Sequence, residues 1–104
     1  MSRFRIEHPH DPERHAYAGH DHAVGFFCEV YRGERREKPV KTLDVFTTER
    51  PVTLISALDF LANQGFFSHE DLEDALLWMR DEEPEHGSAA ALKIVSIIES
   101  FKAE

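Results

Sequence analysis

Cysteine is almost absent from this chain of 104 residues, which contains Cys28 alone. A single cysteine cannot form an intramolecular disulfide, so the sequence favours a reducing compartment over a secreted location. Long apolar runs are also missing, because no stretch approaches the roughly 18–20 residues that a membrane span requires. The chain turns charged at Arg3 and Arg5, too early for the apolar part of a signal peptide. These absences predict a cytoplasmic protein without a membrane segment.

Positive charge is scarce as well. The chain has 12 Lys and Arg residues and 20 Asp and Glu residues, which gives a net charge of −8. Proteins that bind nucleic acids displace counterions with Lys and Arg, and their domain pI is usually above about 9. The pI of this chain is near 5.3, which disfavours nucleic acid as the main partner. Residues 1–50 sum to zero charge, and residues 51–104 carry the whole −8. A surface divided in this way suits binding to a partner protein or to a second copy of the chain.

The known signatures of catalysis are missing too. The sequence has no phosphate-binding glycine loop, no Gly-x-Ser-x-Gly, no His-Glu-x-x-His and no Cys-x-x-Cys. It has no internal repeat or low-complexity linker, and its length fits one domain. We expect a single domain over residues 1–104, with a histidine-rich segment at 1–22, a β-hairpin at 23–47 and a three-helix part at 51–103.

Alternation of side chains predicts the hairpin. The first strand, residues 23–31, has one wholly apolar face, made of Val24, Phe26, Cys28 and Val30. The second strand is expected at 40–47, after the polar connector 32–39. Two strands alone are marginal in water, and residues 3–7 alternate well enough to offer a third. Residues 8–22 are expected to be irregular, because Pro9 and Pro12 lack the N–H that a regular ladder uses.

The apolar pattern changes to a helical one from Pro51 onward. A first helix is predicted to begin at Pro51 and to stop near Gly65. Apolar residues occupy most of its circumference, so we expect the helix to be buried on several sides. Ser68 is a predicted N-cap for the second helix, and Ser88 for the third. In the third helix, the side chains expected to face the core are Ile94, Val95, Ile98 and Phe101. The predicted fold is therefore α+β, a small antiparallel sheet packed against three C-terminal helices.

The histidine-rich segment is a candidate metal site. His20, Asp21 and His22 place two imidazoles two residues apart, so that they share a face if the chain is extended. Imidazole with carboxylate suits Zn, Ni, Cu or non-haem Fe, and further ligands are available at His8, His10 and His15. Neutral imidazole is also suited to general base catalysis near neutral pH. The alternative is a set of solvated loop histidines, since no rigid frame or fixed ligand spacing supports the site.

A basic stretch is the second candidate. Five cations between residues 32 and 41, reduced by Glu34 and Glu37, give the tip of the predicted hairpin a local charge of +3: Arg32, Arg35, Arg36, Lys38 and Lys41. It is a predicted contact for an acidic partner or another anion. The alternative is that these charges keep an exposed connector soluble and prevent wrong pairing at a sheet edge. Cys28 lies on the apolar face of a strand, so we expect a small buried hydrophobe and not a nucleophile.

These observations favour a small acidic cytoplasmic protein that works through protein contacts, including self-association, and that is not an enzyme. Two alternatives stay open. One is a protein that binds a divalent metal through the N-terminal histidines, and the other is a small enzyme that depends on one of them. No cofactor other than such a metal is expected.

Overall fold

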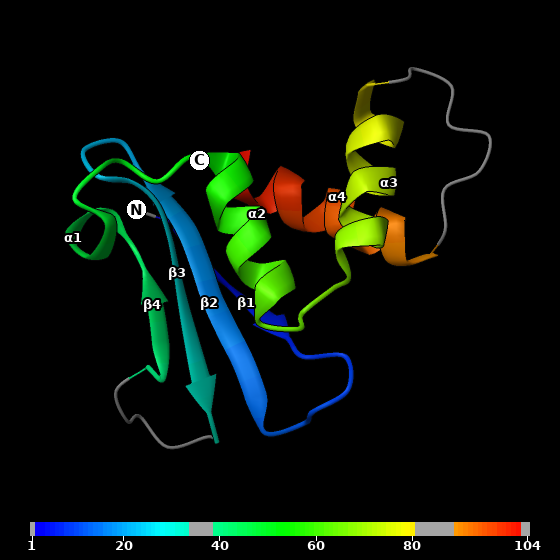
Figure 1. Cartoon of the computed structure of the whole chain (residues 1–104), viewed down its shortest axis with the longest axis horizontal. Coiled ribbons are helices and arrows are strands. Elements are labelled where there is room, and N and C mark those ends of the chain that lie inside the picture. Colours follow the sequence, from blue (N-terminus) through cyan, green and yellow to red (C-terminus); the bar gives the residue numbers. More distant parts are fainter. Residues whose placement is uncertain (1, 34–38, 81–88, 103–104) are drawn as a thin grey trace.

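The computed structural model describes residues 2–33, 39–80 and 89–102. Within these ranges the chain forms first the strands and then the helices (Figure 1). The strands are β1 (Ser2–Glu7), β2 (Arg14–Asp21), β3 (Gly25–Arg32) and β4 (Lys41–Leu43). The helices are α1 (Val45–Thr48), α2 (Leu54–Asn63), α3 (His69–Arg80) and α4 (Ala89–Lys102).

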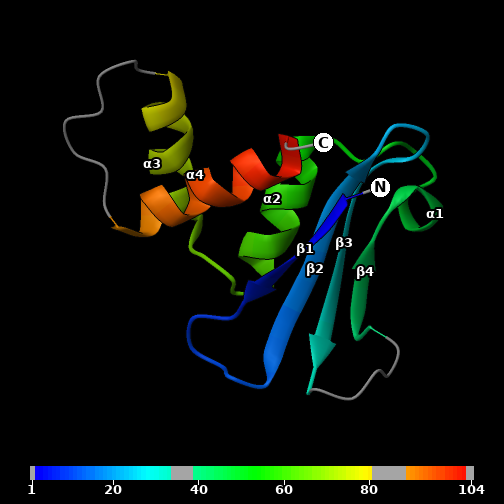
Figure 2. The same cartoon turned by 180° about the vertical axis from the view of Figure 1, so that it is seen from behind.

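The strands form one antiparallel sheet in the order β1-β2-β3-β4. Helix α2 packs against β3 and helix α4 against β2, while α3 packs on α4 and α2, farther from the sheet (Figures 1 and 2). The predicted α+β fold is therefore confirmed, with the sheet in the N-terminal half and the helices after it. Among the described residues no helix is long and apolar enough to cross a membrane.

The core lies between the sheet and the pair α2 and α4. The predicted apolar face of the first hairpin strand is largely correct, because Cys28 and Val30 are buried and Phe26 packs against the core. Phe101 of α4 reaches the sheet, and its ring lies 5.0 Å from that of Phe4 and 5.4 Å from that of Phe26. The other fully buried side chains come from both layers and from α3: Ala16 and Ala18 of β2, Ala57, Leu58 and Leu61 of α2, Ala75 of α3, and Ala91, Ile94 and Ile98 of α4.

The prediction that residues 8–22 are irregular is wrong for 14–21, which form β2 at the centre of the sheet. Pro9 and Pro12 lie in the turn before the strand, so they remove no donor from its ladder. The residues of β2 that face the core are small, since Ala16 and Ala18 pair with Val30 and Cys28. Alanine gives a weak hydrophobic signal, which is why the period of two was not apparent in the sequence.

The second hairpin strand is shorter than predicted, because β4 ends at Leu43 and the helical turn α1 replaces the expected extension to residue 47. A capping box explains the change. The Asp44 side chain accepts a hydrogen bond from the Thr47 amide (2.9 Å), and the Thr47 hydroxyl accepts one from the Asp44 amide (3.0 Å). These reciprocal bonds favour a helical turn over an extended backbone.

The first long helix, α2, begins at Leu54 and not at Pro51. Val52 is held extended by a parallel bridge to Gly25, with the Phe26 amide 3.2 Å from the Val52 carbonyl oxygen, and Thr53 then caps the helix. The predicted stop is confirmed, because Gly65 has a φ of +85° and Phe66 donates back to the Leu61 carbonyl.

The expected burial of α2 on several sides is only partly correct. The helix packs on β3 and on α3, but its remaining side is open to solvent, and Ile55 there is 50% exposed.

The last two helices agree with the sequence pattern. The Ser68 hydroxyl accepts a hydrogen bond from the Asp71 amide at 3.0 Å, which confirms it as the N-cap of α3. Ile94, Ile98 and Phe101 of α4 are buried as expected, and Val95 is partly buried. The predicted cap at Ser88 lies outside the described residues.

Candidate interaction surface

The pairing of the strands divides their side chains between two faces of the sheet. Residues directly opposite each other in an antiparallel pair point to the same face. Since Phe4, Ala18 and Cys28 face the helices, the alternate residues face away from them. We call this second face the open sheet face: Arg3, Arg5 and Glu7 of β1, His15 and Tyr17 of β2, and Phe27, Glu29 and Tyr31 of β3.

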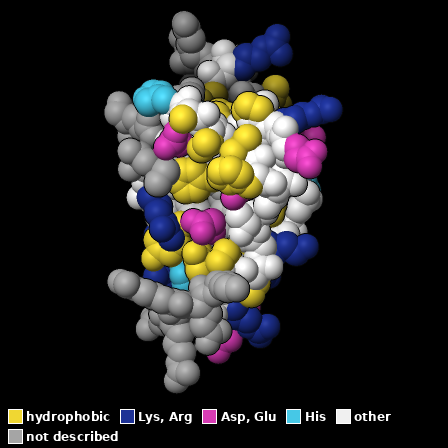
Figure 3. Space-filling model, turned by 90° about the vertical axis from the view of Figure 1, so that its left-hand side faces the viewer, with side chains coloured by type: hydrophobic (Ala, Val, Ile, Leu, Met, Phe, Trp, Pro, Cys, Tyr) yellow, Lys and Arg dark blue, Asp and Glu magenta, His cyan; other side chains and the backbone are white. Residues whose placement is uncertain are grey.

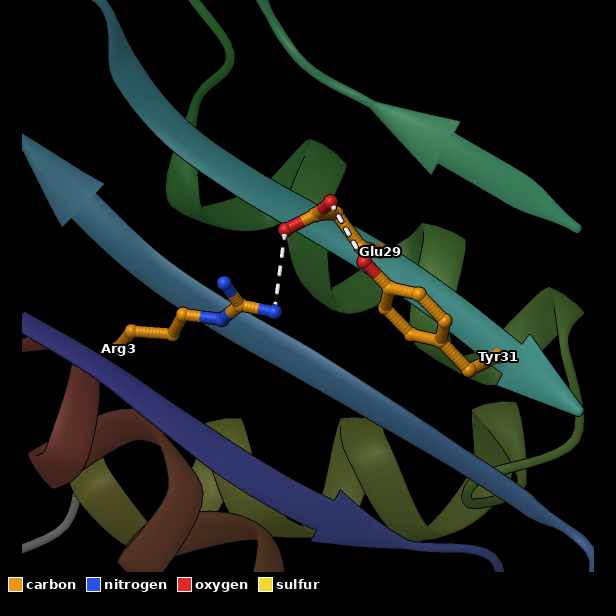
Figure 4. A network of polar contacts seen from close by, with 3 residues as sticks. All are labelled: Arg3, Glu29 and Tyr31. Atoms are coloured by element: carbon orange, nitrogen blue, oxygen red, sulfur yellow. Dashed lines mark hydrogen bonds and ion pairs between the residues drawn. The ribbon is translucent and has the colours of Figure 1, made fainter. Parts of the chain in front are cut away.

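Arg3 joins the three long strands across this face. Its guanidinium carbon lies 4.1 Å from the centre of the Tyr17 ring, and its Nη2 is 3.7 Å from a carboxylate oxygen of Glu29. The other oxygen of Glu29 accepts a hydrogen bond from the Tyr31 hydroxyl at 3.0 Å. Figure 4 shows these polar contacts in front of the strands, with the helices behind the sheet. The cation is thus held between an aromatic ring and a carboxylate.

Three rings form the centre of the open sheet face. His15 is stacked on Tyr31 with the planes 10° apart and the ring centres separated by 5.5 Å. Tyr17 presents its edge to both neighbours, at 5.5 Å from His15 and 5.8 Å from Tyr31. His15 is only 7% exposed, although no helix in the described part of the chain covers this face, because the tyrosine rings shield it. The face is therefore a packed aromatic surface and not a solvated polar one.

Charged groups at the β1 side of the face keep their charge. The hydrogen bond that Arg5 donates to Glu7, 2.5 Å long, raises the pKa of Arg5, and the Tyr17 side chain, as a second hydrogen-bond acceptor for Arg5, acts in the same direction. The same contact lowers the pKa of Glu7. On β3, burial and then the hydrogen bond to Glu29 raise the pKa of Tyr31, so its hydroxyl stays protonated and donates to the carboxylate. The arrangement suits binding.

A second surface lies at the α1 and β4 side of the molecule. Phe46 of α1 is 82% exposed and Val40, just before β4, is 56% exposed. Figure 3 looks at this side and shows hydrophobic side chains gathered near its centre, with acidic ones among them. The surface lies beside the outer strand β4, and α1 contacts β3 as well as β4.

The predicted metal residues lie at the turn between β2 and β3. The Asp21 carboxylate accepts a hydrogen bond from the Ala23 amide at 2.7 Å, which closes the turn. The His20 ring lies 4.5 Å from that of Phe26 and 5.6 Å from that of His22. In the described part of the chain, no group of three His, Cys, Asp or Glu side chains is arranged to hold a metal ion. The metal site stays a prediction.

The other histidines of the segment lie elsewhere. His8 and His10 precede β2, whereas His20 lies at its far end and His22 just after it, so the strand separates the two pairs. The Nδ1 of His8 accepts hydrogen bonds from the amides of His10 (3.1 Å) and Asp11 (3.0 Å), and the ring packs 5.1 Å from that of Phe66. His8 therefore shapes the turn from β1 to β2. A role for any of these histidines as a general base also stays a prediction.

The basic stretch is only partly described. Arg32 is exposed and lies 3.7 Å from Glu13, and Lys41 is exposed on β4. The remaining members, Arg35, Arg36 and Lys38, lie outside the described residues. Contact of this stretch with an acidic partner stays a prediction.

Cys28 has no nucleophilic character in this fold. It is completely buried, and burial raises the pKa of its thiol to about 12. Thiolate is the reactive form of cysteine, so the expectation of an inert buried residue agrees with the structure.

Sequence reasoning missed the open sheet face because it missed β2. The outer residues of β3 were visible as an alternating set, namely Phe27, Glu29 and Tyr31. The matching alternation of His15 and Tyr17 was the available signal for the strand that completes the face.

Comparisons with models of known protein families, with curated proteins and with solved structures give no significant match. The functional argument therefore depends on the geometry of this chain.

Proposed function

We propose that this protein is a non-enzymatic interaction module that associates with a second copy of itself through the open sheet face. The observation that carries the proposal is the packed array of Arg3, Tyr17, Glu29 and Tyr31 on a sheet face that no described helix covers. Arginine and tyrosine are enriched at the energetic centres of protein interfaces. The aromatic surface of this array is already partly buried in the single chain, and neighbouring side chains hold it in place. Less conformational entropy is therefore lost on binding.

The charges of this face are complementary to each other. The basic side chains Arg3 and Arg5 lie on β1, and Glu29 lies on β3 at the opposite side of the aromatic centre. A two-fold axis parallel to the strands, lying between the two facing sheets, would place β1 of one copy over β3 of the other. Arg3 of each copy would then meet Glu29 of its partner, and the tyrosine rings would lie between the two sheets.

Charge reversal tests the proposal by light scattering and sedimentation at tens of micromolar protein. Glu29→Arg and Arg3→Glu should each weaken self-association by about tenfold or more, because like charges then face each other. The double variant should regain much of the affinity, since opposite charges face each other again. Leu77→Arg is the matched control, because Leu77 is 57% exposed on α3 and lies away from the sheet.

A strict monomer at low salt would contradict self-association. A dimer that all of these variants leave unchanged would contradict the assignment to the open sheet face.

A further inference from the structure

A groove runs along the free edge of the sheet, between β1 and α4. One part of it, about 330 Å³, is lined by residues 4–7 of β1 and by Lys93, Ser96, Ile97 and Ser100 of α4. A second hollow of about 300 Å³ shares Lys93 and Ile97 with the first and continues towards the turn after β1. Its floor is apolar, made of Phe66, Phe67, Ile94 and Ile97. Figure 2 shows β1 at the edge of the sheet, beside α4.

The outer edge of β1 offers backbone hydrogen bonds. The His8 amide donates to the Arg14 carbonyl at 3.2 Å, which places the even-numbered residues of β1 in the ladder with β2. Backbone groups alternate in direction along a strand, so those of Arg3, Arg5 and Glu7 point outward. No strand among the described residues pairs with this edge. It is a free template for an added strand.

The length of the groove fits a short extended segment. Its lining on α4 runs from Ala90 to Ser100, about 15 Å at about 1.5 Å per helical residue. That distance accommodates about five residues of extended chain at about 3.3 Å each.

The charge of the groove selects the chemistry of that segment. Arg5 and Lys93 line the groove and Arg3 precedes it on β1, and all three are cationic and exposed, although the protein as a whole carries −8. Two carboxylates line it as well. That of Glu7 is bound by Arg5 and lies in the field of Lys93, and that of Asp71 lies in the second hollow, which no residue of β1 lines. Beside the edge of β1, cations therefore outnumber carboxylates. A second copy of β1 is a poor occupant, because it brings two more arginines and one glutamate to this cationic edge.

We propose that the groove between β1 and α4 binds an extended peptide segment of a partner protein, with acidic and large apolar side chains in alternation. The peptide adds a fifth strand to the sheet. Its acidic residues lie opposite Arg3 and Arg5, and its apolar residues turn towards Ile97 and the apolar hollow. This site goes beyond self-association, since it uses the edge of β1 and the groove beside α4 and does not require the dimer, although it shares Arg3 and Arg5 with the open sheet face.

Titration with a blocked synthetic peptide of alternating leucine and glutamate tests the site. Amide signals of residues 3–7 and 93–100 should shift in NMR spectra, and hydrogen exchange at Arg3, Arg5 and Glu7 should slow, as strand addition requires. A peptide with lysine in place of glutamate should bind about tenfold more weakly. N-methylation of the glutamate amides should weaken binding as well, because it removes the donors to β1.

Variants of α4 separate the groove from the rest of the surface. Ser96 and Leu92 are both exposed on α4, but only Ser96 lines the groove. Ser96→Arg should block the peptide, while Leu92→Arg should leave its affinity unchanged. The titration is repeated on Glu29→Arg, which lacks the proposed dimer contact, so that failure of self-association does not affect the result.

Three results would overturn the proposal: no shift at residues 3–7, equal affinity for the glutamate and lysine peptides, or insensitivity to Ser96→Arg. Loss of self-association in Ser96→Arg with the dimer intact in Glu29→Arg would also overturn it, because a second copy would then occupy the groove.

Discussion

Arg3 lies over the ring of Tyr17, and the two residues are diagonal neighbours on adjacent strands. The residue directly opposite Arg3 is Gly19, while Tyr17 is opposite Arg5. Because Gly19 has no side chain, the guanidinium of Arg3 can extend across β2, with its carbon 4.1 Å from the Tyr17 ring centre, and reach Glu29 on β3. A missing side chain thus allows one cation to connect three strands.

A double-mutant cycle measures this contact. Arg3→Met keeps most of the aliphatic stem and removes the cation, and Tyr17→Leu removes the ring. We expect a coupling free energy of about 0.5–1 kcal/mol between them, the range of exposed cation–π contacts. Urea denaturation of the four proteins supplies the values. The same cycle with Arg80→Met, at the end of α3, should show no coupling to Tyr17→Leu.

Gly25 is a tight contact between β3 and the segment before α2. Its φ is +85°, and a Cβ at this position would lie 3.1 Å from the carbonyl oxygen and 3.2 Å from the amide nitrogen of Val52. Gly33 has nearly the same backbone, with a φ of +84°, but no atom within 4 Å of such a Cβ. Comparing alanine substitutions at these two glycines therefore separates the cost of backbone strain from the cost of steric contact.

Gly33→Ala should lower the free energy of unfolding by about 1–2 kcal/mol, the cost of a left-handed backbone in an L-residue. Gly25→Ala should cost about 1 kcal/mol more, because the backbone of Val52 has to move away. Thermal and urea unfolding of the two variants compare them directly. If the two variants lost the same free energy of unfolding, the backbone of Val52 could move away from the new Cβ at no free-energy cost.

Local signals in the sequence were sufficient for much of this fold. The alternation around Cys28, the Ser68 cap and the glycine stop at residue 65 each depend on a few neighbouring residues, and the structure agrees with all three. The turn α1 is also local, but its capping box between Asp44 and Thr47 was not recognised.

The central strand and the open sheet face depend on long-range pairing. β2 faces the core with alanines, so its burial becomes evident only when both neighbouring strands are in place. The groove beside β1 combines residues 4–7 with residues 93–100, a proximity that no local pattern encodes. The exposed side of α2 could not be predicted for the same reason. The apolar pattern around Ile55 does not indicate which side of the helix the sheet will cover.

Cys28 should be unreactive in the folded protein. With its pKa raised to about 12 by burial, the thiol carries almost no thiolate near neutral pH, and solvent reagents do not reach it. A chromogenic disulfide reagent should react stoichiometrically in denaturant and very slowly without it, at a rate that follows unfolding. Fast native reaction that is independent of denaturant would contradict the buried position.

Stability should fall in mild acid because of His8. Its neutral ring accepts two backbone amides through Nδ1, and burial, followed by the charge of Arg14, lowers its pKa from 6.5 in the folded state. Well above pH 6.5 the ring is neutral in both states. As the pH decreases below that value the unfolded chain binds the proton first, so the free energy of unfolding decreases until the folded pKa is passed.

His8→Asn isolates this contribution, since an amide oxygen can accept the same two backbone amides but does not titrate. Chemical denaturation at several pH values between about 7 and 5 should show a smaller acid loss for His8→Asn than for the wild type. His69→Asn is the control, because it changes an exposed histidine at the start of α3 and leaves His8 in place. If His8→Asn lost as much stability in acid as the wild type, protonation of His8 would not be the cause. The turn between β1 and β2 would then have to tolerate a charged ring.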